Sequence, residues 1–268
     1  MNDYVVLVLN EVRKWVDAFS HAPIERKQQF VYDLYSDGWK DLNDCRKGGR
    51  LSLVDGRWTK VSRMELDTLF VSEHYKRIKQ ALHDKTDEKI KVLEVGAGYG
   101  KVTFPLSSLF PQAEFFAIEY THSGPQTAKK YKSQYRHSIK QVASRIGVYH
   151  DKNSLVESFE SGDAKSLQFT DKFFDLSYTN LVLEQIPNKE DHIKLLQEMK
   201  RVTKRFCCFL EPWGEAQNFF TRTYLKRIDY FHESWKMLYE IGFKNVRYYA
   251  THFHHCPRFR IGYVIAEI

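Results

Sequence analysis

The sequence contains no apolar run that approaches the roughly 20 residues needed to cross a bilayer. The apolar stretch near the N-terminus, residues 4–9, is short and follows Asp3. A secretory signal peptide has a basic start and a longer apolar region. These absences predict a cytoplasmic protein that does not associate with membranes.

Cysteine is also scarce: the 268 residues include four, and no two of them form a Cys-x-x-Cys pair. Cys207 and Cys208 lie in an apolar run, where thiols usually behave as small buried hydrophobes. We expect free thiols in a reducing compartment. Residues 252–256 hold three histidines and Cys256, but no second ligand group has the spacing of a structural zinc site. We therefore predict no bound metal, and a solvated turn for this segment.

Length and composition are those of a folded chain, with 43% hydrophobic and 28% charged residues. The length suits one large domain with an extension. The formal net charge of +7 would attract nucleic acid, phosphorylated metabolites or anionic lipid, and it also keeps a protein away from neutrality. The charge alone does not choose between these explanations.

Residues 1–85 are expected to form a helical extension. Apolar residues recur at steps of three and four on one face of a first helix, at Val5, Leu9, Val12, Val16 and Phe19. Pro23 opens a second helix. Residues 41–57 contain three glycines and are expected to form a loop, and Ser72 is the expected N-cap of a third helix.

From Lys89 onward, strand-like and helix-like segments alternate, which predicts a mostly parallel sheet with helices on both faces. The domain is expected to span residues 86–268. The last two strands have no helix between them, so we expect an antiparallel pair at one edge. The expected strands are residues 90–95, 115–119, 155–161, 173–178, 206–210, 246–250 and 261–268, and the expected helices are residues 124–142, 191–203 and 231–241.

The most informative segment is residues 92–100, Val-Leu-Glu-Val-Gly-Ala-Gly-Tyr-Gly, where a strand runs into a glycine turn. Glycines let the backbone approach a ligand, and open α/β sheets bind ligands at the carboxyl ends of their strands. A dinucleotide site needs Gly-x-Gly-x-x-Gly or Ala, and its third position is here Lys101. Glu94 would repel a pyrophosphate but would suit the α-amino group of a methionine moiety. The spacing therefore disfavours a nicotinamide enzyme.

Glu94, Gly96, Ala97, Gly98 and Gly100 resemble motif I of the class I S-adenosylmethionine-dependent methyltransferases, whose pattern is acid-x-Gly-x-Gly-x-Gly. The resemblance covers about residues 89–268 and is closest in character to small-molecule members. It implies a Rossmann-like seven-stranded sheet, S-adenosylmethionine bound at these residues, and S-adenosylhomocysteine as product.

Two further segments match the family in order. Glu119, followed by Tyr120, ends a strand where the family has an acid that bonds both ribose hydroxyls. Asp163 and Ala164 resemble the segment that binds adenine, with the aspartate accepting from the exocyclic amine. Each acid also has a plain structural explanation, Glu119 as a surface acid and Asp163 as a turn residue.

Asn180 and Leu181 close a segment that resembles motif IV, and they complete the cofactor-binding set that the resemblance implies. Asn180 could equally cap a helix. Residues 183–187, Leu-Glu-Gln-Ile-Pro, are similar to a Leu-Glu-His-Ile turn of small-molecule members. The Glu211-Pro212 pair is also typical of the family.

The sequence identifies no catalytic base. Gln185 stands where many relatives carry histidine, and glutamine cannot take a proton. Glu184 and His122 are weaker alternatives, so the catalytic residue is left unassigned. For the acceptor, Tyr32, Tyr35 and Trp39 either wall a pocket or pack the extension, with residues 213–220 as the opposite wall.

The function that follows is methyl transfer to an oxygen or nitrogen of a small molecule, such as a sugar, a phosphorylated compound or a secondary metabolite. The alternatives are an RNA methyltransferase and a non-catalytic cofactor-binding protein on the same fold. No RNA-binding motif is present, which places a small acceptor first. Basic side chains that could serve RNA, or simply form polar helix faces, are Lys129, Lys130, Lys132, Arg136, Lys140, Arg145, Arg222, Lys226 and Arg227.

Overall fold

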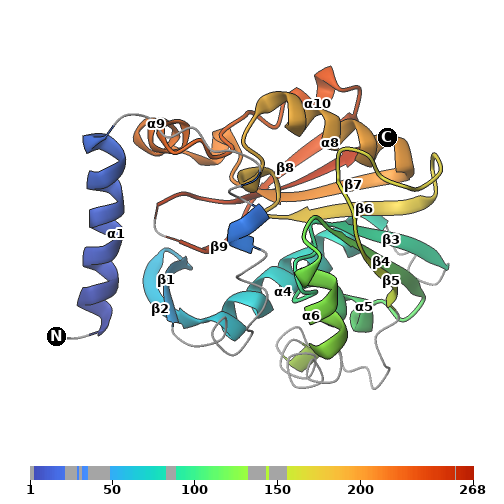
Figure 1. The fold of residues 1–268 in the computed structure, drawn as a ribbon, viewed down its shortest axis with the longest axis horizontal. Coiled ribbons are helices and arrows are strands. Elements are labelled where there is room, and N and C mark those ends of the chain that lie inside the picture. The colour runs from blue at the N-terminus through green and yellow to red at the C-terminus, as the bar shows by residue number, and fades with distance from the viewer. Residues whose placement is uncertain are drawn as a thin grey trace.

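The main element is a seven-stranded sheet of order β5-β4-β3-β6-β7-β10-β8 (Figure 1). The computed structural model describes residues 3–21, 29, 32–35, 49–82, 89–131, 143–144, 156–256 and 258–268. All neighbouring strands are parallel except β10, which runs antiparallel to both β7 and β8. The predicted Rossmann-like α/β fold is thereby confirmed. The strands are β3 (Ile90–Val95), β4 (Ala113–Glu119), β5 (Val156–Ser161), β6 (Phe174–Asn180), β7 (Thr203–Glu211), β8 (Lys244–Ala250) and β10 (Gly262–Glu267).

Strand order reverses between β3 and β6. The chain proceeds outward from β3 to β4 and β5, and then crosses back to place β6 on the other side of β3. The two connections leave β3 and β6 in opposite directions, and such a switch point opens a crevice at the carboxyl ends of the strands. The glycine segment follows β3, and Asn180 ends β6.

Alternating side chains of the central strands supply a separate core on each face. Cys208 and Leu176 face α4 (Arg63–Leu82) and α5 (Thr103–Leu109), whereas Cys207 and Leu93 face α8 (Lys189–Val202) and α10 (Met237–Glu240). Both cysteines are free and fully buried, as their apolar surroundings predict. The other described helices are α1 (Asp3–Ser20), α6 (Ser123–Tyr131), α9 (Phe219–Arg227), and the short 3-10 helices η2 (Leu183–Gln185) and η3 (Gly214–Ala216).

The prediction of a loop over residues 41–57 is wrong for the part of that segment which the structure describes. β1 (Gly49–Val54) and β2 (Arg57–Ser62) form an antiparallel hairpin. Asp55 and Gly56 make its two-residue turn, with φ of 49° and 75°. Asp-Gly suits this turn because both central positions need positive φ. The glycine that suggested a loop is therefore a strand-pairing signal.

The solvated turn expected over residues 252–256 is also wrong. β9 (Phe253–His254) pairs with β1 and completes a second, three-stranded sheet of order β2-β1-β9. His254, His255 and Cys256 are buried, and His252 alone among the four polar residues is exposed. A segment near the end of the chain is thus joined to the hairpin near its beginning.

The helix that was expected to follow Ser72 begins at Arg63, which lies nine residues before Ser72. Ser62 and Glu65 form a capping box: the Glu65 amide donates to the Ser62 hydroxyl at 3.2 Å, and the Ser62 amide donates to the Glu65 carboxylate at 2.7 Å. Ser72 lies inside the helix, where its hydroxyl donates to the Thr68 carbonyl at 2.7 Å.

The first helix forms as predicted, but its apolar stripe faces outward. The five stripe residues are 44–56% exposed, and α1 stands apart from the main sheet (Figure 1). It contacts the body through Trp15, whose ring lies 4.5 Å from that of Tyr224 on α9, and through Glu11, which pairs with Arg258 at 2.8 Å. Within the described residues, no helix has the length and apolar character to span a membrane.

Two other expected helices differ in extent. The one expected over residues 231–241 is reduced to α10, because the Glu233 carbonyl accepts from the Gly214 amide at 2.8 Å and Phe231 is buried in the core. Gly242, with φ of 88°, follows α10 as expected. The helix expected over residues 124–142 is α6 as far as Tyr131, and the remainder lies outside the described residues.

Candidate active site

The turn after β3 is built from glycines that hold the left-handed conformation. Gly96 and Gly98 have φ of 73° and 57°. The amides of Gly96 and Ala97 both donate to the Ile118 carbonyl, at 2.8 and 3.0 Å. A Cβ at Gly96 would collide with the Val182 side chain. The turn is therefore fixed between β4 and the loop that follows β6.

Gly100, also predicted to contact the cofactor, does not line the pocket. Its φ is 83°, and a Cβ there would overlap the rings of Phe104 and Phe159. These rings are stacked with centroids 5.8 Å apart. The third glycine therefore allows close packing beneath the turn, while its contact with the cofactor stays a prediction.

Glu94 is a buried carboxylate at the carboxyl end of β3. One of its oxygens accepts hydrogen bonds from the Thr103 hydroxyl and, at 2.6 Å, from the Tyr178 hydroxyl. Burial raises its pKa to about 7, and the two hydroxyl donors oppose that rise. Glu94 lines the pocket and would ionise fully when a cation approaches it.

Glu119 ends β4 and also lines the pocket. Its carboxylate accepts from the Gly98 amide at 2.8 Å and from the amide and hydroxyl of Thr121, both at 3.0 Å. Burial raises its pKa, and these donors counteract the rise. The side chain is thus fixed against the glycine turn. Tyr120, which follows it, lines the same pocket with a 39% exposed side chain.

Asp163 and Ala164 follow β5 and line the pocket. The Asp163 carboxylate accepts from the Lys165 amide at 2.9 Å, as in a local turn. Lys165 extends to Asp191 at 2.9 Å, and that pairing holds the segment against α8. The segment is therefore ordered at the pocket's rim while Asp163 keeps acceptor capacity.

Asn180 and Leu181 complete the predicted set at the end of β6, and both line the pocket. Leu181 adopts a φ of 58°, and its amide donates to the Leu210 carbonyl at 3.0 Å. The buried Glu211 carboxylate then accepts from the amides of Val182 and Leu183, at 2.9 and 3.1 Å. The family-like Glu211 thus acts on the loop after β6 and does not line the cavity.

A buried histidine fixes the Asn180 side chain, and nothing in its local sequence marks it. His74 lies on α4, with Nε2 3.2 Å from Asn180 Oδ1 and Nδ1 3.0 Å from the Tyr263 hydroxyl. Because burial lowers the pKa of His74 to about 3, the ring is neutral. An amide oxygen only accepts, so Nε2 carries the proton and Nδ1 accepts from Tyr263. Asn180 is left with its NH₂ group to donate elsewhere.

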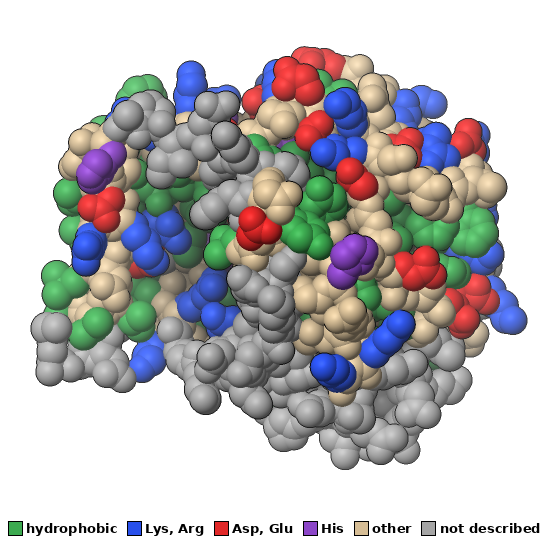
Figure 2. Space-filling view, viewed as in Figure 1, with side chains coloured by type: hydrophobic (Ala, Val, Ile, Leu, Met, Phe, Trp, Pro, Cys, Tyr) green, Lys and Arg blue, Asp and Glu red, His purple; other side chains and the backbone are tan. Residues whose placement is uncertain are grey.

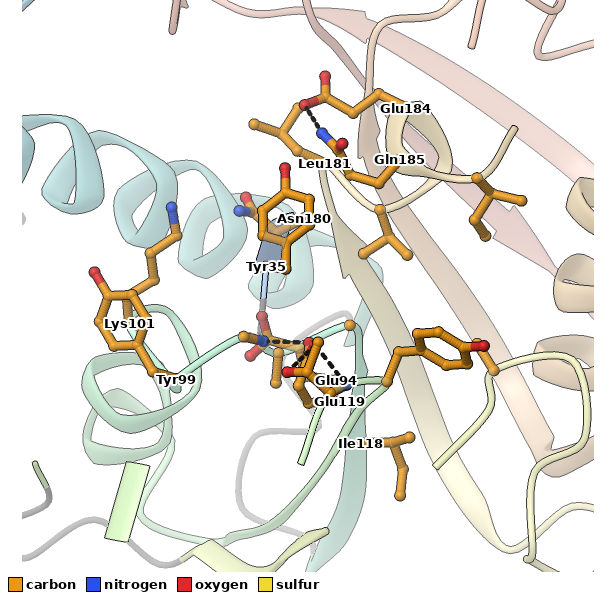
Figure 3. Close-up of a pocket in the computed structure, with 18 of the residues that line it drawn as sticks. Tyr35, Glu94, Tyr99, Lys101, Ile118, Glu119, Asn180, Leu181, Glu184 and Gln185 are labelled. Carbon is orange, nitrogen blue, oxygen red and sulfur yellow. Dashed lines mark hydrogen bonds between the residues drawn. The ribbon is translucent and has the colours of Figure 1, made fainter. Parts of the chain in front are cut away.

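One cavity of about 250 Å³ lies between the glycine turn, the ends of the strands and α4. Ten of the eleven predicted cofactor residues line it, Gly100 being the exception. The acids Glu94 and Glu119 lie at one end of the view in Figure 3, and the Glu184–Gln185 pair lies at the other. Lining residues that the sequence did not single out are Arg50, Arg63, Leu66, Asp67, Phe70, Tyr99, Lys101, Ile118, Thr121, Gly162, Lys165, Val182, Ile186 and His255.

Some of the missed residues carried a signal. Arg63, Leu66, Asp67 and Phe70 recur at steps of three and four on one face of α4, so the capping box at Ser62 would have revealed them. Arg50 and His255 lie beyond such local reasoning, because their place depends on the pairing of β1 with β9.

Of the two proposed acceptor walls, only the first has described residues that line the cavity. Tyr32 and Tyr35 line the cavity, whereas Trp39 lies outside the described residues. Within residues 213–220 the opposite wall is absent: Trp213 is fully buried in the core, and Phe219 and Phe220 are exposed.

Of the weaker base candidates, His122 is exposed, bonds Ser161 at 3.1 Å and lies outside the cavity lining. Glu184 lines the cavity, is buried, and accepts from the Gln185 amide at 2.7 Å. The glutamine that replaces the expected histidine therefore orients a neighbouring carboxylate.

Residues 93–206 match the family model of a methyltransferase domain. This segment, less than half of the chain, is therefore identified as a methyltransferase domain. Enzymes of this family use S-adenosylmethionine as methyl donor. No curated protein matches the chain significantly.

Solved methyltransferases share the fold. An S-adenosylmethionine-dependent methyltransferase from Methanosarcina mazei is 18% identical with a TM-score of 0.50, over 69% of this chain and 95% of that one. Magnesium protoporphyrin IX methyltransferase from Synechocystis, with bound S-adenosylmethionine, is 13% identical with a TM-score of 0.54, over 90% and 96%. Human N-acetylserotonin methyltransferase is 14% identical with a TM-score of 0.51, over 76% and 54%.

The packing role of Gly100 in this methyltransferase is testable against a matched glycine. Gly100→Ala should lower the free energy of unfolding by about 2–4 kcal/mol, from left-handed strain and overpacking against Phe104. Gly56→Ala should lower it by only about 1 kcal/mol, because Gly56 has a similar φ but nothing within 4 Å of a Cβ. Urea unfolding measures both, and equal losses would contradict the packing role.

The raised pKa of Glu94 predicts pH-dependent cofactor binding. Below pH 7 the ligand-free carboxyl is largely protonated, and a bound cation favours the ionised form. Affinity for S-adenosylhomocysteine should therefore rise with pH up to about 7, by at most about tenfold per unit for this group, with release of a proton. Calorimetry at pH 6 in buffers of different ionisation enthalpy counts that proton. Glu94→Gln should release fewer protons than wild type, and equal release would exclude Glu94 as the linked group.

Proposed function

We propose that this methyltransferase transfers the methyl group of S-adenosylmethionine to an oxygen or nitrogen of a small molecule held in the cavity beside the glycine turn. The observation that carries the proposal is the composition of that cavity. Its lining joins the strand-end residues of the main sheet to residues of α4, Tyr32 and Tyr35. One side therefore suits the methyl donor and the other side suits an acceptor.

For the donor, Glu94 and Glu119 supply the two carboxylates that the ligand's chemistry calls for. Glu94 would compensate the α-amino charge, and Glu119 would accept hydrogen bonds from the ribose hydroxyls. Asp163 would accept from the adenine amine. Asn180, held through its oxygen by His74, would donate from its amide nitrogen. The glycine turn leaves its backbone open to close approach by the ligand.

S-adenosylmethionine supplies an activated methyl group when bound, so the protein's main contribution is alignment. The cavity excludes bulk water and limits the directions from which an acceptor can approach, and such positioning accounts for much of the rate in a direct displacement. Glu184, oriented by Gln185, is the carboxylate placed to receive a proton from the acceptor. His122 lies outside the cavity lining and takes no part.

A small acceptor is favoured over RNA by the enclosure of this space. Residues of α4 and the tyrosines close the cavity on the side away from the sheet. The basic residues that might have served RNA divide between α9, α6 and residues outside the described part of the chain. None of the five that the structure describes lines the cavity.

Calorimetric titration with S-adenosylhomocysteine tests the donor site. Wild type should bind with micromolar affinity, and Glu119→Ala should weaken binding by roughly tenfold or more through the loss of hydrogen bonds to a charged group. Glu160→Ala, an exposed acid on the neighbouring β5, is the matched control and should bind as wild type does. Absence of binding by folded wild type would overturn the proposed function.

A further inference from the structure

The cavity is lined by charged residues of both signs. Glu94, Glu119 and Asp163 lie at the strand ends, where the donor is proposed to bind. The lining also contains Arg50, Arg63 and Lys101 and, besides the strand-end acids, the carboxylates of Asp67 and Glu184. Lys165, the remaining cation of the lining, is bonded to Asp191. We call the part of the cavity lined by Arg50 and Arg63 its basic side.

Arg50 and Arg63 come from adjoining elements and line the same cavity. Arg50 lies on β1 opposite Val61 of β2, and Arg63 is the first residue of α4, directly after β2. The capping box at Ser62 fixes the point where the chain turns from β2 into α4.

Neither arginine is neutralised within the described part of the chain. No described carboxylate lies within 4.0 Å of either guanidinium, whereas Lys101 lies 3.5 Å from Asp67. In Figure 2 the Lys and Arg side chains are spread over the visible face of the molecule. Guanidinium groups facing a partly enclosed space without counter-charge are well suited to bind an oxyanion in a bidentate manner.

A buried histidine without a full set of hydrogen bonds is an independent observation on the same side of the cavity. His255 lines the cavity, is fully buried, and its Nδ1 has no hydrogen-bond partner among the described residues. Burial lowers its pKa well below the ordinary value, and the charges of Arg50, Lys101 and Arg258 lower it further. The ring is therefore neutral inside a positive field and adds a polar group without competing for the anion.

We propose that the acceptor carries an oxyanionic group, a carboxylate or a phosphate, which Arg50 and Arg63 bind at the basic side of the cavity. The proposal rests on the proposed function, because it gives the acceptor an orientation relative to the donor. The anion lies at the arginines, and the remainder of the acceptor extends toward Glu184 and the glycine turn. A neutral acceptor would leave the two guanidinium charges uncompensated.

The test uses probes of one shape and different charge. Phenyl phosphate, benzoate and benzyl alcohol are titrated into the full-length protein saturated with S-adenosylhomocysteine and, separately, into the free protein. Wild type should bind one or both anions, with affinity that falls as salt rises, and should not bind the alcohol detectably. The preferred anion then distinguishes a phosphate acceptor from a carboxylate acceptor.

The variant that removes the site is Arg50→Gln combined with Arg63→Gln. It should weaken anion binding by tenfold or more and leave the affinity for S-adenosylhomocysteine unchanged. Arg57→Gln, an exposed arginine of β2 outside the cavity, is the control and should bind as wild type does. Unchanged thermal unfolding of the double variant excludes loss of folding.

Three results would overturn the proposal: neither anion binds wild type, the alcohol binds equally well, or the double variant binds the anion as wild type does. Binding of a single-stranded RNA in place of the small anions would also overturn it, in favour of a nucleic-acid acceptor. These failures differ from failure of the proposed function, which shows as absent S-adenosylhomocysteine binding while the free protein still binds the anion.

Discussion

A buried carboxylate at the centre of an apolar sheet sets the conditions for the rest of this site. Glu94 lies one residue before the end of β3, and a charge there without partners would cost several kcal/mol. Tyr178 from β6 and Thr103 from α5 satisfy one of its oxygens, so the acid ties together three elements that meet at the switch point. Since its pKa is about 7, the carboxyl can exist neutral in the free protein and ionised beside a cation. The cost of burying it is thereby offset in the ligand-bound state, where its charge is useful.

Charges of the opposite sign also line this cavity. The acids at the strand ends suit a cationic donor, and the arginines of the hairpin region suit an anion. On the proposed assignment the two groups of charges share one cavity, so the strand-end acids favour the donor and the arginines favour an anionic acceptor. An acceptor with an anionic end would consequently approach with its uncharged part toward the methyl group. The division of charge therefore contributes orientation, which a direct displacement requires.

Whether a feature of the fold or the site could be predicted depends on whether the residues that determine it are neighbours in the sequence. Strand β3 was predictable because a buried parallel strand is mostly apolar, and the glycine turn because its function needs special backbone conformations. At Gly100 the sequence could not distinguish a packing role from ligand contact, because both requirements select the same residue. The β1–β2 hairpin was missed because its strands are short and partly exposed, so that Gly56 outweighed the alternation around it.

The residues that no local pattern could place are those fixed by pairing between distant segments. His255 reaches the cavity only because β9 pairs with β1, across some 200 positions of the chain, as the Ser52–His255 hydrogen bond between residues 203 apart also shows. His74 reaches Asn180 because α4 packs on the sheet beside Tyr263. In both cases the residue type carries no information until the tertiary structure is known.

This distribution also explains the extent of the family match. The matched residues, 93–206, contain the glycine turn, Glu119, Asp163 and Asn180, which form the donor side of the cavity. Arg50, Arg63 and His255 all lie outside that range, in segments brought together by the small sheet and the start of α4. Donor chemistry is shared among methyltransferases and constrains the matched part, whereas the acceptor contacts depend on parts of the chain that the shared pattern leaves free. On the proposed assignment, segments far apart in the chain together form the acceptor side, so a change in how β9 pairs with β1 is expected to alter acceptor binding and to leave the donor site intact.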